Sequence, residues 1–364
     1  MGVRWPRIRL SGTFAAAVVL ATALVACSDE TAETPGSSSK PHPAPAVFGA
    51  TSVVTDRLAA PWSIAFHGGV ALIGERDSAR VLELDARGGT RAVATIPGVA
   101  GTGEGGMLGI AVRDGNLYVY STTPDGNRLQ RYPLTGQPGS LGIGPGETLL
   151  NEIASARYHN GGRIAFGPDG MLYATVGDAG DRASAQDRNA LTGKILRMTP
   201  EGRVPRDNPF PGSLVYSYGH RNPQGIGWAA DGTLYASEFG QDTWDELNII
   251  EAGGNYGWPE VEGAAGRPEF IDPVQQWEPA VASPSGVAVT EDALFVANLR
   301  GERLREIPLS DPSVSAEHLA GEYGRLRDVV TAPDGALWVL TNNTDGRGDP
   351  RPGDDRVLRI VPGR

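Results

Sequence analysis

Hydrophobic and polar residues alternate in short runs along this chain, and each run follows a tight-turn signal. Asp114–Tyr120 is one such unit, in which an Asp-Gly pair precedes a run typical of a strand. An Asp-Gly pair favours the positive φ angles of a two-residue hairpin turn. The unit returns, degenerate at its first occurrence, at Gly68–Ile73, Pro168–Val176, Asp231–Ser237, Glu291–Ala297 and Pro333–Leu340.

These repeats predict an all-β architecture. Each copy follows a short apolar run such as Gly162–Phe166, and several precede another strand, such as Lys194–Met198 or Arg356–Ile360. Six copies, spaced by roughly 43–62 residues, fit blades of antiparallel strands. A two-sheet sandwich is the alternative, but one sandwich rarely uses so long a chain. We therefore expect a six-bladed β-propeller of four-stranded blades over residues 48–364, with loops of every blade converging at its axis.

The composition agrees with a folded chain that makes many tight turns. It contains 50 glycines and 28 prolines among 364 residues, while 40% hydrophobic residues suffice for a core. A formal net charge of −11 argues against non-specific nucleic-acid binding, which needs a cationic face. The single cysteine excludes an intramolecular disulfide and a zinc site built from several cysteines.

The N-terminal residues have the layout of an export signal. Three arginines precede an apolar stretch at about 14–25, which is too short to span a bilayer comfortably. Leu24–Cys27 then resembles a bacterial lipoprotein lipobox. We expect residues 1–26 to be a lipoprotein signal peptide, Cys27 to carry the lipid on the outer face of the bacterial cell membrane, and residues 27–47 to form a flexible tether. A plain signal peptide with an incidental cysteine is the alternative.

The longer connections between repeats carry the candidate chemistry. His159 lies in a glycine-flanked turn just before a predicted strand. The segment Tyr218–Gly225 places Arg221 and Asn222 between two glycines. Arginine presents five fixed donors and asparagine adds an amide, so this segment suits an anionic, oxygen-rich ligand. Taken alone, either segment could be a structured turn with solvated side chains.

Two more segments indicate a cation site and an anion site. Ser237–Asn248 is acidic and precedes a glycine-rich stretch, and carboxylates with loop carbonyls are what Ca²⁺ requires, although the spacing differs from that of an EF-hand. An acidic surface loop is the alternative. Arg325 and Arg327 are two apart, which sends both side chains to one face, and Arg300 ends a separate strand. Arginines from several blades of an acidic protein indicate a local anion site.

Together these segments resemble the soluble glucose and aldose sugar dehydrogenases that depend on pyrroloquinoline quinone (PQQ). The resemblance runs from about Trp62 to Ile360 and rests on the spacing of the Tyr158–Arg163 turn, Gly219–Gly225 and Gly253–Pro259. That family consists of six-bladed propellers. The resemblance implies oxidation of an aldose at C1 to a lactone, with PQQ and Ca²⁺ as cofactors and an external electron acceptor.

The resemblance also implies roles for single residues. His159 matches the general base that accepts the C1 hydroxyl proton, while hydride passes to C5 of the quinone. Arg221 matches a residue that stabilises negative charge on the C5 oxygen, and Asn222 matches a quinone contact.

The remaining arginines match cofactor-binding positions. Arg325 and Arg327 match a pair that meets the carboxylates of the cofactor. Arg300 stands where the glucose dehydrogenase branch has a lysine, so the positive charge is kept with altered geometry. Glu104 stands where the family often has glutamine, and a carboxylate there would sit badly against an anionic cofactor unless it is protonated or paired.

Four residues match two calcium sites. The main-chain carbonyls of Gly240 and Gln241 match ligands of the calcium that touches the quinone; proline is usual where Gln241 stands, and a backbone ligand tolerates that change. Glu246, through its side chain, and Tyr256, through its main chain, match a second, structural calcium. The chain diverges after Pro259, so family contacts to the sugar cannot be transferred there.

These observations predict an exported, membrane-anchored enzyme, with a monomer favoured. The alternative from another class is a non-catalytic propeller that binds a ligand or a protein at the cell surface, since fold does not fix function. A scaffold has no need of His159, Arg221, Asn222, Arg325 and Arg327 together. A third reading, a calcium-dependent lactonase propeller, gains nothing from the arginines.

Overall fold

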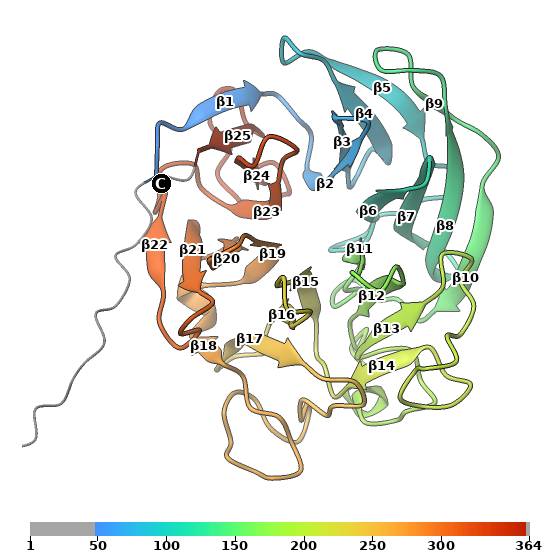
Figure 1. The fold of residues 1–364 in the computed structure, drawn as a ribbon, viewed down its shortest axis with the longest axis vertical. Coiled ribbons are helices and arrows are strands. Elements are labelled where there is room, and N and C mark those ends of the chain that lie inside the picture. Colours follow the sequence, from blue (N-terminus) through green and yellow to red (C-terminus); the bar gives the residue numbers. More distant parts are fainter. Residues whose placement is uncertain (1–47, 362–364) are drawn as a thin grey trace, which may run out of the picture. The chain divides into compact units, whose positions relative to one another are not determined.

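Six antiparallel sheets surround a common axis in residues 48–361, the part of the chain that the computed structural model describes (Figure 1). The predicted all-β, six-bladed propeller is thus confirmed. The predicted signal peptide, lipid site and tether lie outside the described residues. No helix within residues 48–361 is long and apolar enough to cross a membrane.

The blades follow one another along the chain. The first three contain β2 (Pro61–His67), β3 (Val70–Glu75), β4 (Arg80–Leu84) and β5 (Thr90–Thr95); β6 (Met107–Arg113), β7 (Asn116–Thr123), β8 (Gly126–Thr135) and β10 (Glu147–Ile153); and β11 (Ile164–Phe166), β12 (Leu172–Val176), β13 (Lys194–Met198) and β14 (Val215–Tyr218). A short β9 (Gly142–Ile143) pairs with β8 beside the second blade.

The other three blades complete the ring. They contain β15 (Pro223–Trp228), β16 (Leu234–Glu238), β17 (Asp245–Ile250) and β18 (Gln275–Trp277); β19 (Pro284–Val289), β20 (Ala293–Asn298), β21 (Arg303–Pro308) and β22 (Ala316–His318); and β23 (Leu326–Thr331), β24 (Leu337–Thr341), β25 (Val357–Ile360) and β1 (Ser52–Thr55). Two 3₁₀ helices, η1 (Arg182–Ala185) and η2 (Pro279–Val281), lie in connections.

The predicted repeat unit forms the second strand of every blade, namely β3, β7, β12, β16, β20 and β24. The turn chemistry is more varied than predicted. Asp114 and Gly115 both have positive φ, as a two-residue hairpin requires. At Pro168–Gly170 only the glycine does, because the Asp169 carboxylate instead accepts the amide of Met171 and closes the turn by itself.

The N-terminal strand closes the ring. β1 pairs antiparallel with β25, with Ser52 opposite Arg359, so both ends of the described chain build the sixth blade. The core lies between neighbouring blades. For example, Tyr173 and Ile195 of the third blade pack against Ile226 and Ala236 of the fourth. Inner strands such as β12 are buried on both faces and therefore lack a polar face.

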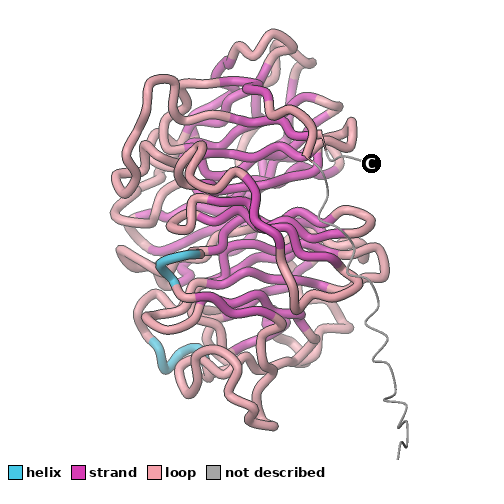
Figure 2. The backbone as a smooth tube through the Cα atoms, turned by 90° about the vertical axis from the view of Figure 1, so that its left-hand side faces the viewer, coloured by secondary structure: helices cyan, strands magenta, loops and turns pink. Residues whose placement is uncertain are grey.

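Antiparallel pairing divides the connections between two ends of the propeller. The Asp-Gly turns join first to second strands at one end. Connections from second to third strands, and from each blade to the next, meet at the other end, which we call the site end. Figure 2 shows loops at both ends of the strands and the two 3₁₀ helices on one side, within the site-end loops. All predicted site residues except Tyr256 lie in or beside site-end connections, and Tyr256 lies in the long connection from β17 to β18.

Candidate functional site

A cavity of about 220 Å³ at the site end is rich in arginine. We call it the arginine cavity. It is lined by Trp62, Arg76, Glu104, Asn160, Gln224, Phe239, Ser283, Leu299, Arg300, Arg325, Arg327 and Arg347. The structure thus brings together the predicted Glu104, Arg300, Arg325 and Arg327. Two arginines were not predicted, because nothing in their local sequence distinguishes a cavity arginine from a solvated one.

Arg327 is a buried cation that no carboxylate of residues 48–361 contacts. Its side chain donates to Gln224 Oε1 at 3.1 Å and to the more distant oxygens of Ser285 and Asn342 at 3.4 Å, all of them neutral. Burial, with the charges of Arg325 and Arg76 nearby, lowers the pKa of Arg327 to about 9 despite the attraction of Asp345. An anion in this cavity would relieve that cost.

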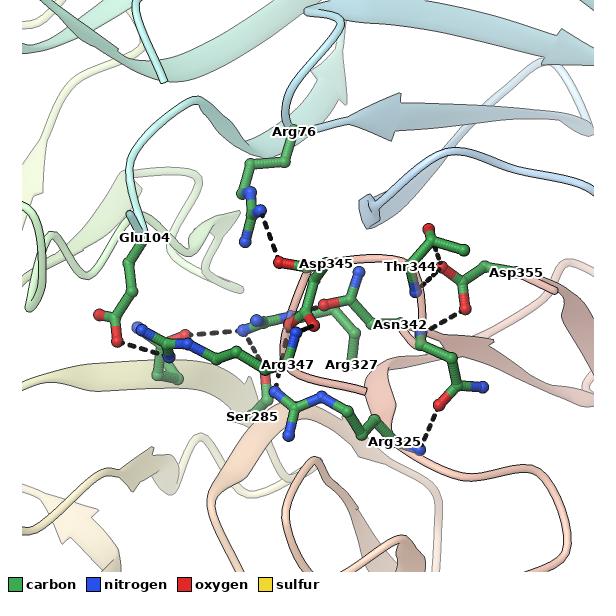
Figure 3. A network of polar contacts seen from close by, with 12 residues as sticks. Arg76, Glu104, Ser285, Arg325, Arg327, Asn342, Thr344, Asp345, Arg347 and Asp355 are labelled. Carbon is green, nitrogen blue, oxygen red and sulfur yellow. Dashed lines mark hydrogen bonds and ion pairs between the residues drawn. The ribbon is translucent and has the colours of Figure 1, made fainter. Parts of the chain in front are cut away.

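Asp345 is the carboxylate that organises the neighbouring arginines (Figure 3). It pairs with Arg325 at 3.1 Å, and its main-chain oxygen accepts Arg76 Nη2 at 3.2 Å. Asp345 thus holds Arg325 through its carboxylate and Arg76 through its main chain, while Arg76 also pairs with Asp77 at 2.6 Å. The excess positive charge of the cavity is that of Arg327. Trp62 forms part of the wall, with the guanidinium carbons of Arg163 and Arg327 4.2 and 5.5 Å from its ring centroid.

Several buried donors around the site lack a partner. The Nε atoms of Arg325 and Arg221 and the Nδ2 atom of Asn222 find no acceptor within residues 48–361. Folded proteins seldom leave such groups unpaired, so the site is suited to a ligand rich in acceptor oxygens.

Glu104 is paired, which answers the doubt about a carboxylate in this position. One of its oxygens contacts Arg347 at 2.8 Å, and the other accepts the His159 amide at 2.9 Å. Burial acts to raise its pKa, but these two hydrogen bonds outweigh burial and hold the pKa of Glu104 below its usual value. Glu104 therefore positions the main chain of His159, and its charge is matched by Arg347.

His159 is fixed in a strained backbone conformation with φ of +58°, unusual for a residue other than glycine. Its Nδ1 atom lies 2.7 Å from Asp178 Oδ1. Burial acts to raise the pKa of Asp178, but hydrogen bonds from His159, Gly180 and Trp258 outweigh it and lower that pKa. An ionised Asp178 keeps the proton on Nδ1, which leaves Nε2 as a free acceptor.

A second cavity, of about 260 Å³, contains this histidine. We call it the base cavity; it is lined by Tyr158, His159, Asp178, Gly180, Arg182, Arg221, Gln241 and Trp258. Trp258 Nε1 donates to Asp178 Oδ2 at 2.9 Å, and the Arg221 guanidinium carbon lies 5.4 Å from the Trp258 ring centroid. His159 and Arg221 therefore share one cavity and are linked through Asp178 and Trp258.

Glu238 holds the main chain of Arg221 and Asn222. One oxygen of Glu238 accepts the main-chain amides of both residues. Asn222 in turn accepts the Gly161 amide at 3.0 Å and so ties the Arg221 loop to the His159 loop. The Arg221 Nη1 atom donates to the carbonyls of Phe239, which lines the arginine cavity, and Gly240. The two cavities are therefore adjacent.

A third cavity is small and acidic, with a volume of about 10 Å³, enough for a single water or ion. We call it the acidic cavity; it is lined by Gly219, Arg221, Glu238, Phe239, Gly240, Glu246, Tyr256, Trp258, Val261 and Glu262. Burial and the charge of Glu238 raise the pKa of Glu246 to about 8. A carboxyl in this state stays protonated near neutral pH unless a cation joins it.

The two predicted calcium sites differ in how their residues come together. Glu246 and Tyr256, predicted for the structural calcium, both line the acidic cavity. Gly240 and Gln241, predicted for the calcium that touches the quinone, line the acidic cavity and the base cavity respectively. The Gly240 carbonyl accepts Arg221. Among residues 48–361, no group of three or more His, Cys, Asp or Glu side chains is arranged to hold a metal, so a cation here would depend on main-chain oxygens.

Sequence reasoning missed several functional residues. Asp178 and Trp258 hold the base, Arg347 neutralises Glu104, and Asp345 orders the arginines. Asp178 had a usable signal, because it stands directly after a strand core and Gly177 in a glycine-rich turn. Trp258 lies within the Gly253–Pro259 motif, whereas Asp345 and Arg347 are recognisable only from their contacts in space.

Known proteins share this architecture. The PQQ-bound form of an aldose sugar dehydrogenase from Streptomyces coelicolor is 48% identical, with a TM-score of 0.83 over 87% of this chain and 98% of its own. An aldose sugar dehydrogenase from Escherichia coli is 29% identical over 81% of this chain and 90% of its own. Quinoprotein glucose dehydrogenase B from Acinetobacter calcoaceticus is 31% identical over 52% of this chain and 48% of its own.

The family model of glucose and sorbosone dehydrogenases matches residues 58–351. The match runs from just before the first blade into the last connection of the sixth, and it includes every residue of the arginine, base and acidic cavities. The chain therefore belongs to the glucose/sorbosone dehydrogenase family.

Proposed function

We propose that this protein is an aldose sugar dehydrogenase that uses PQQ and Ca²⁺ to oxidise an aldose at C1 to a lactone. The observation that carries the proposal is the buried Arg327, which no carboxylate of residues 48–361 contacts, in a cavity beside a histidine whose Nδ1 atom is held by Asp178. PQQ is a planar quinone with three carboxylates. Its shape suits a cavity walled by Trp62, and its charge suits the arginines.

The residues that would hold PQQ are those of the arginine cavity and its border. Arg325 and Arg327 would meet carboxylates, with Arg300 at the exposed rim. The unpaired Asn222 Nδ2 and Arg221 Nε donors lie where quinone oxygens could accept them. When bound, PQQ supplies the electron acceptor that no side chain of the protein provides.

The protein's own residues supply the proton chemistry. The Nε2 atom of His159 accepts the proton of the C1 hydroxyl, while ionised Asp178 holds Nδ1–H and stabilises the imidazolium that forms. Glu104 keeps the His159 main chain in its strained conformation. Arg221 offers a fixed positive charge at the border of the two cavities, where negative charge would develop on an oxygen.

We place a structural calcium in the acidic cavity, with Glu246 and the main chain around Tyr256 as ligands. A cation there would pair with Glu246 and offset its repulsion by Glu238. A calcium on the carbonyls of Gly240 and Gln241 would have to displace Arg221 from Gly240. Binding of that cation would therefore redirect Arg221.

The experiment is reconstitution. Protein lacking residues 1–26 is titrated with PQQ, with and without Ca²⁺, and dye reduction is followed with a panel of aldoses before and after EDTA. We expect sugar-dependent reduction that needs both cofactors. Tight PQQ binding without turnover of any aldose would favour the non-catalytic propeller, and absence of PQQ binding would overturn the dehydrogenase proposal.

We further propose that the enzyme is an exported monomer, anchored through lipid on Cys27 and delivering electrons to an external acceptor. The pattern at Leu24–Cys27 supports the anchor. Substitution Cys27→Ser should move the protein from the membrane fraction to the soluble fraction. Recovery of both forms in the membrane fraction would contradict the anchor.

A further inference from the structure

Arg182 lines the base cavity, and no carboxylate within the described residues 48–361 pairs with it. Its guanidinium carbon lies 4.5 Å from the Trp258 ring centroid, and its side chain is exposed. No hydrogen bond or ion pair joins its side chain to any residue in 48–361. An arginine with no internal partner at the mouth of a cavity is available to a ligand.

The position of Arg182 is set by a rigid support. Arg182 begins η1, and the carbonyls of Ser184 and Ala185 in that helix accept the Nζ atom of Lys194 at 2.7 and 3.0 Å. Lys194 is fully buried. The Ser184 hydroxyl also accepts Thr192 at 2.7 Å. Because these contacts fix the backbone that carries Arg182, binding of a ligand by Arg182 costs little backbone conformational entropy.

The charges of the base cavity favour an anion. Arg182 and Arg221 both stack on Trp258. Among the described residues that line this cavity, Asp178 is the only carboxylate, and both of its oxygens are engaged, by His159, Gly180 and Trp258. The cavity beside the base therefore has excess positive charge, although the protein as a whole is acidic.

We infer that the aldose oxidised here carries an anionic group remote from C1, and that Arg182 binds it. The inference rests on the proposed function, because it names the substrate class of the same site. A sugar whose C1 hydroxyl meets His159 Nε2 extends into the cavity that Arg182 lines. A carboxylate or phosphate at its far end would form charge-assisted hydrogen bonds with the guanidinium. A hexuronic acid or an aldose phosphate has that chemistry, whereas a neutral aldose does not.

The reaction itself is unaltered by the remote anion. The C1–H hydrogen leaves with both bonding electrons to the quinone, the C1 hydroxyl proton passes to His159, and C1 becomes the carbonyl carbon of a lactone. The anionic group is conserved in the product. Its contribution is to bind and orient the sugar.

The test compares kcat/KM for glucuronate with glucose, for galacturonate with galactose, and for glucose 6-phosphate with glucose, in the PQQ- and Ca²⁺-loaded enzyme. We expect the charged sugars to be preferred. Arg182→Gln should lower the ratio of charged to neutral sugar by roughly tenfold, the size of one charge-assisted hydrogen bond. The phosphate and carboxylate arms distinguish the two sources of the anion.

The matched control is Arg188→Gln. Arg188 is another exposed arginine of the same connection, stacked on Phe210, but it does not line the cavity. This variant should keep the wild-type ratio. Calorimetry of glucuronate binding to the unloaded protein adds a readout independent of turnover, and Arg182→Gln should weaken that binding.

The possible outcomes distinguish failure of this inference from failure of the proposed function. Turnover of neutral aldoses with no preference for charged ones, and an unchanged ratio in Arg182→Gln, would overturn this inference and leave the proposed function standing. Failure of every aldose with the loaded enzyme would overturn the proposed function, and the calorimetric comparison would then decide whether Arg182 binds sugar acids.

Discussion

The arginine cavity and the acidic cavity are opposites in charge. In the first, Arg327 is buried against neutral partners, and its pKa falls to about 9. In the second, Glu246 is buried beside Glu238, and its pKa rises to about 8. Burying either charge without a counterion is unfavourable, and a ligand of opposite charge would offset that cost. The proposed anion site and the proposed cation site share Phe239 in their linings, and Arg221 lines the acidic cavity.

The largest expected effect concerns His159 in the base cavity, which shares Arg221 and Trp258 with the acidic cavity. His159→Asn removes the proton acceptor, while asparagine tolerates the positive φ at this position. We expect kcat to fall by about 10³-fold with PQQ and Ca²⁺ affinities unchanged. Dye-reduction kinetics and PQQ titration measure the two quantities. A parallel loss of PQQ binding would show that His159 belongs to the anion site.

The second largest effect is expected when the positive charge of Arg327 is removed from the arginine cavity. Arg327→Gln should weaken PQQ binding by about 100-fold, because a buried charge pair is lost, and should not destabilise the unliganded protein. The matched control is Arg197→Gln: Arg197 is equally buried but pairs with Asp169 and Asp207. That variant should lose stability in urea and retain PQQ affinity. An equal loss of PQQ affinity in Arg327→Gln and Arg197→Gln would contradict the assignment of the anion site to the arginine cavity.

A smaller effect concerns the acidic cavity and pH. A carboxyl whose pKa rises on folding binds its proton more tightly in the folded state. Without calcium, the free energy of unfolding should therefore fall as pH rises from the ordinary value of 4.5 through about 8. Calcium binds the ionised form, so it should raise the melting temperature more at pH 8 than at pH 6. In Glu246→Gln, the free energy of unfolding and the effect of calcium on the melting temperature should both depend less on pH.

The smallest effect is expected at Glu104. Its partner Arg347 is about half exposed, so the ion pair contributes little. Glutamine would still accept the His159 amide, so Glu104→Gln should change kcat by about threefold at most. Glu104→Ala, which releases that amide, should cost more. If the two variants behave alike, Glu104 does not position His159.

The sequence predicts local features well. The second strand of every blade was predictable, because its turn and its β-forming residues are adjacent in the chain. The residues that the family motifs single out, Glu104, His159, Arg221, Arg325 and Arg327, all lie at one end of the axis. The chemistry of these residues depends on neighbours in space, and those are set by closure of the ring.

Two features of the site could not be predicted from the local sequence. Glu104 and Arg347 are separated by 243 residues, so no local pattern could reveal that the carboxylate is paired. Gly240 and Gln241 are adjacent, yet they line different cavities. Their turn wraps around Glu262, whose Oε1 atom accepts the amides of residues 241–244. A carboxylate from a distant segment thus decides where this loop directs its carbonyls.

The pairing of β1 with β25 has a consequence for biosynthesis. Among the described strands, β1 is made first and its partner β25 is made last. The ring therefore cannot close before β25 has been made, and a chain that stops short of β25 leaves β1 unpaired and the sixth blade open. Because the arginine cavity needs Arg325, Arg327 and Arg347 from that blade and its connections, cofactor binding would show that the sixth blade has formed.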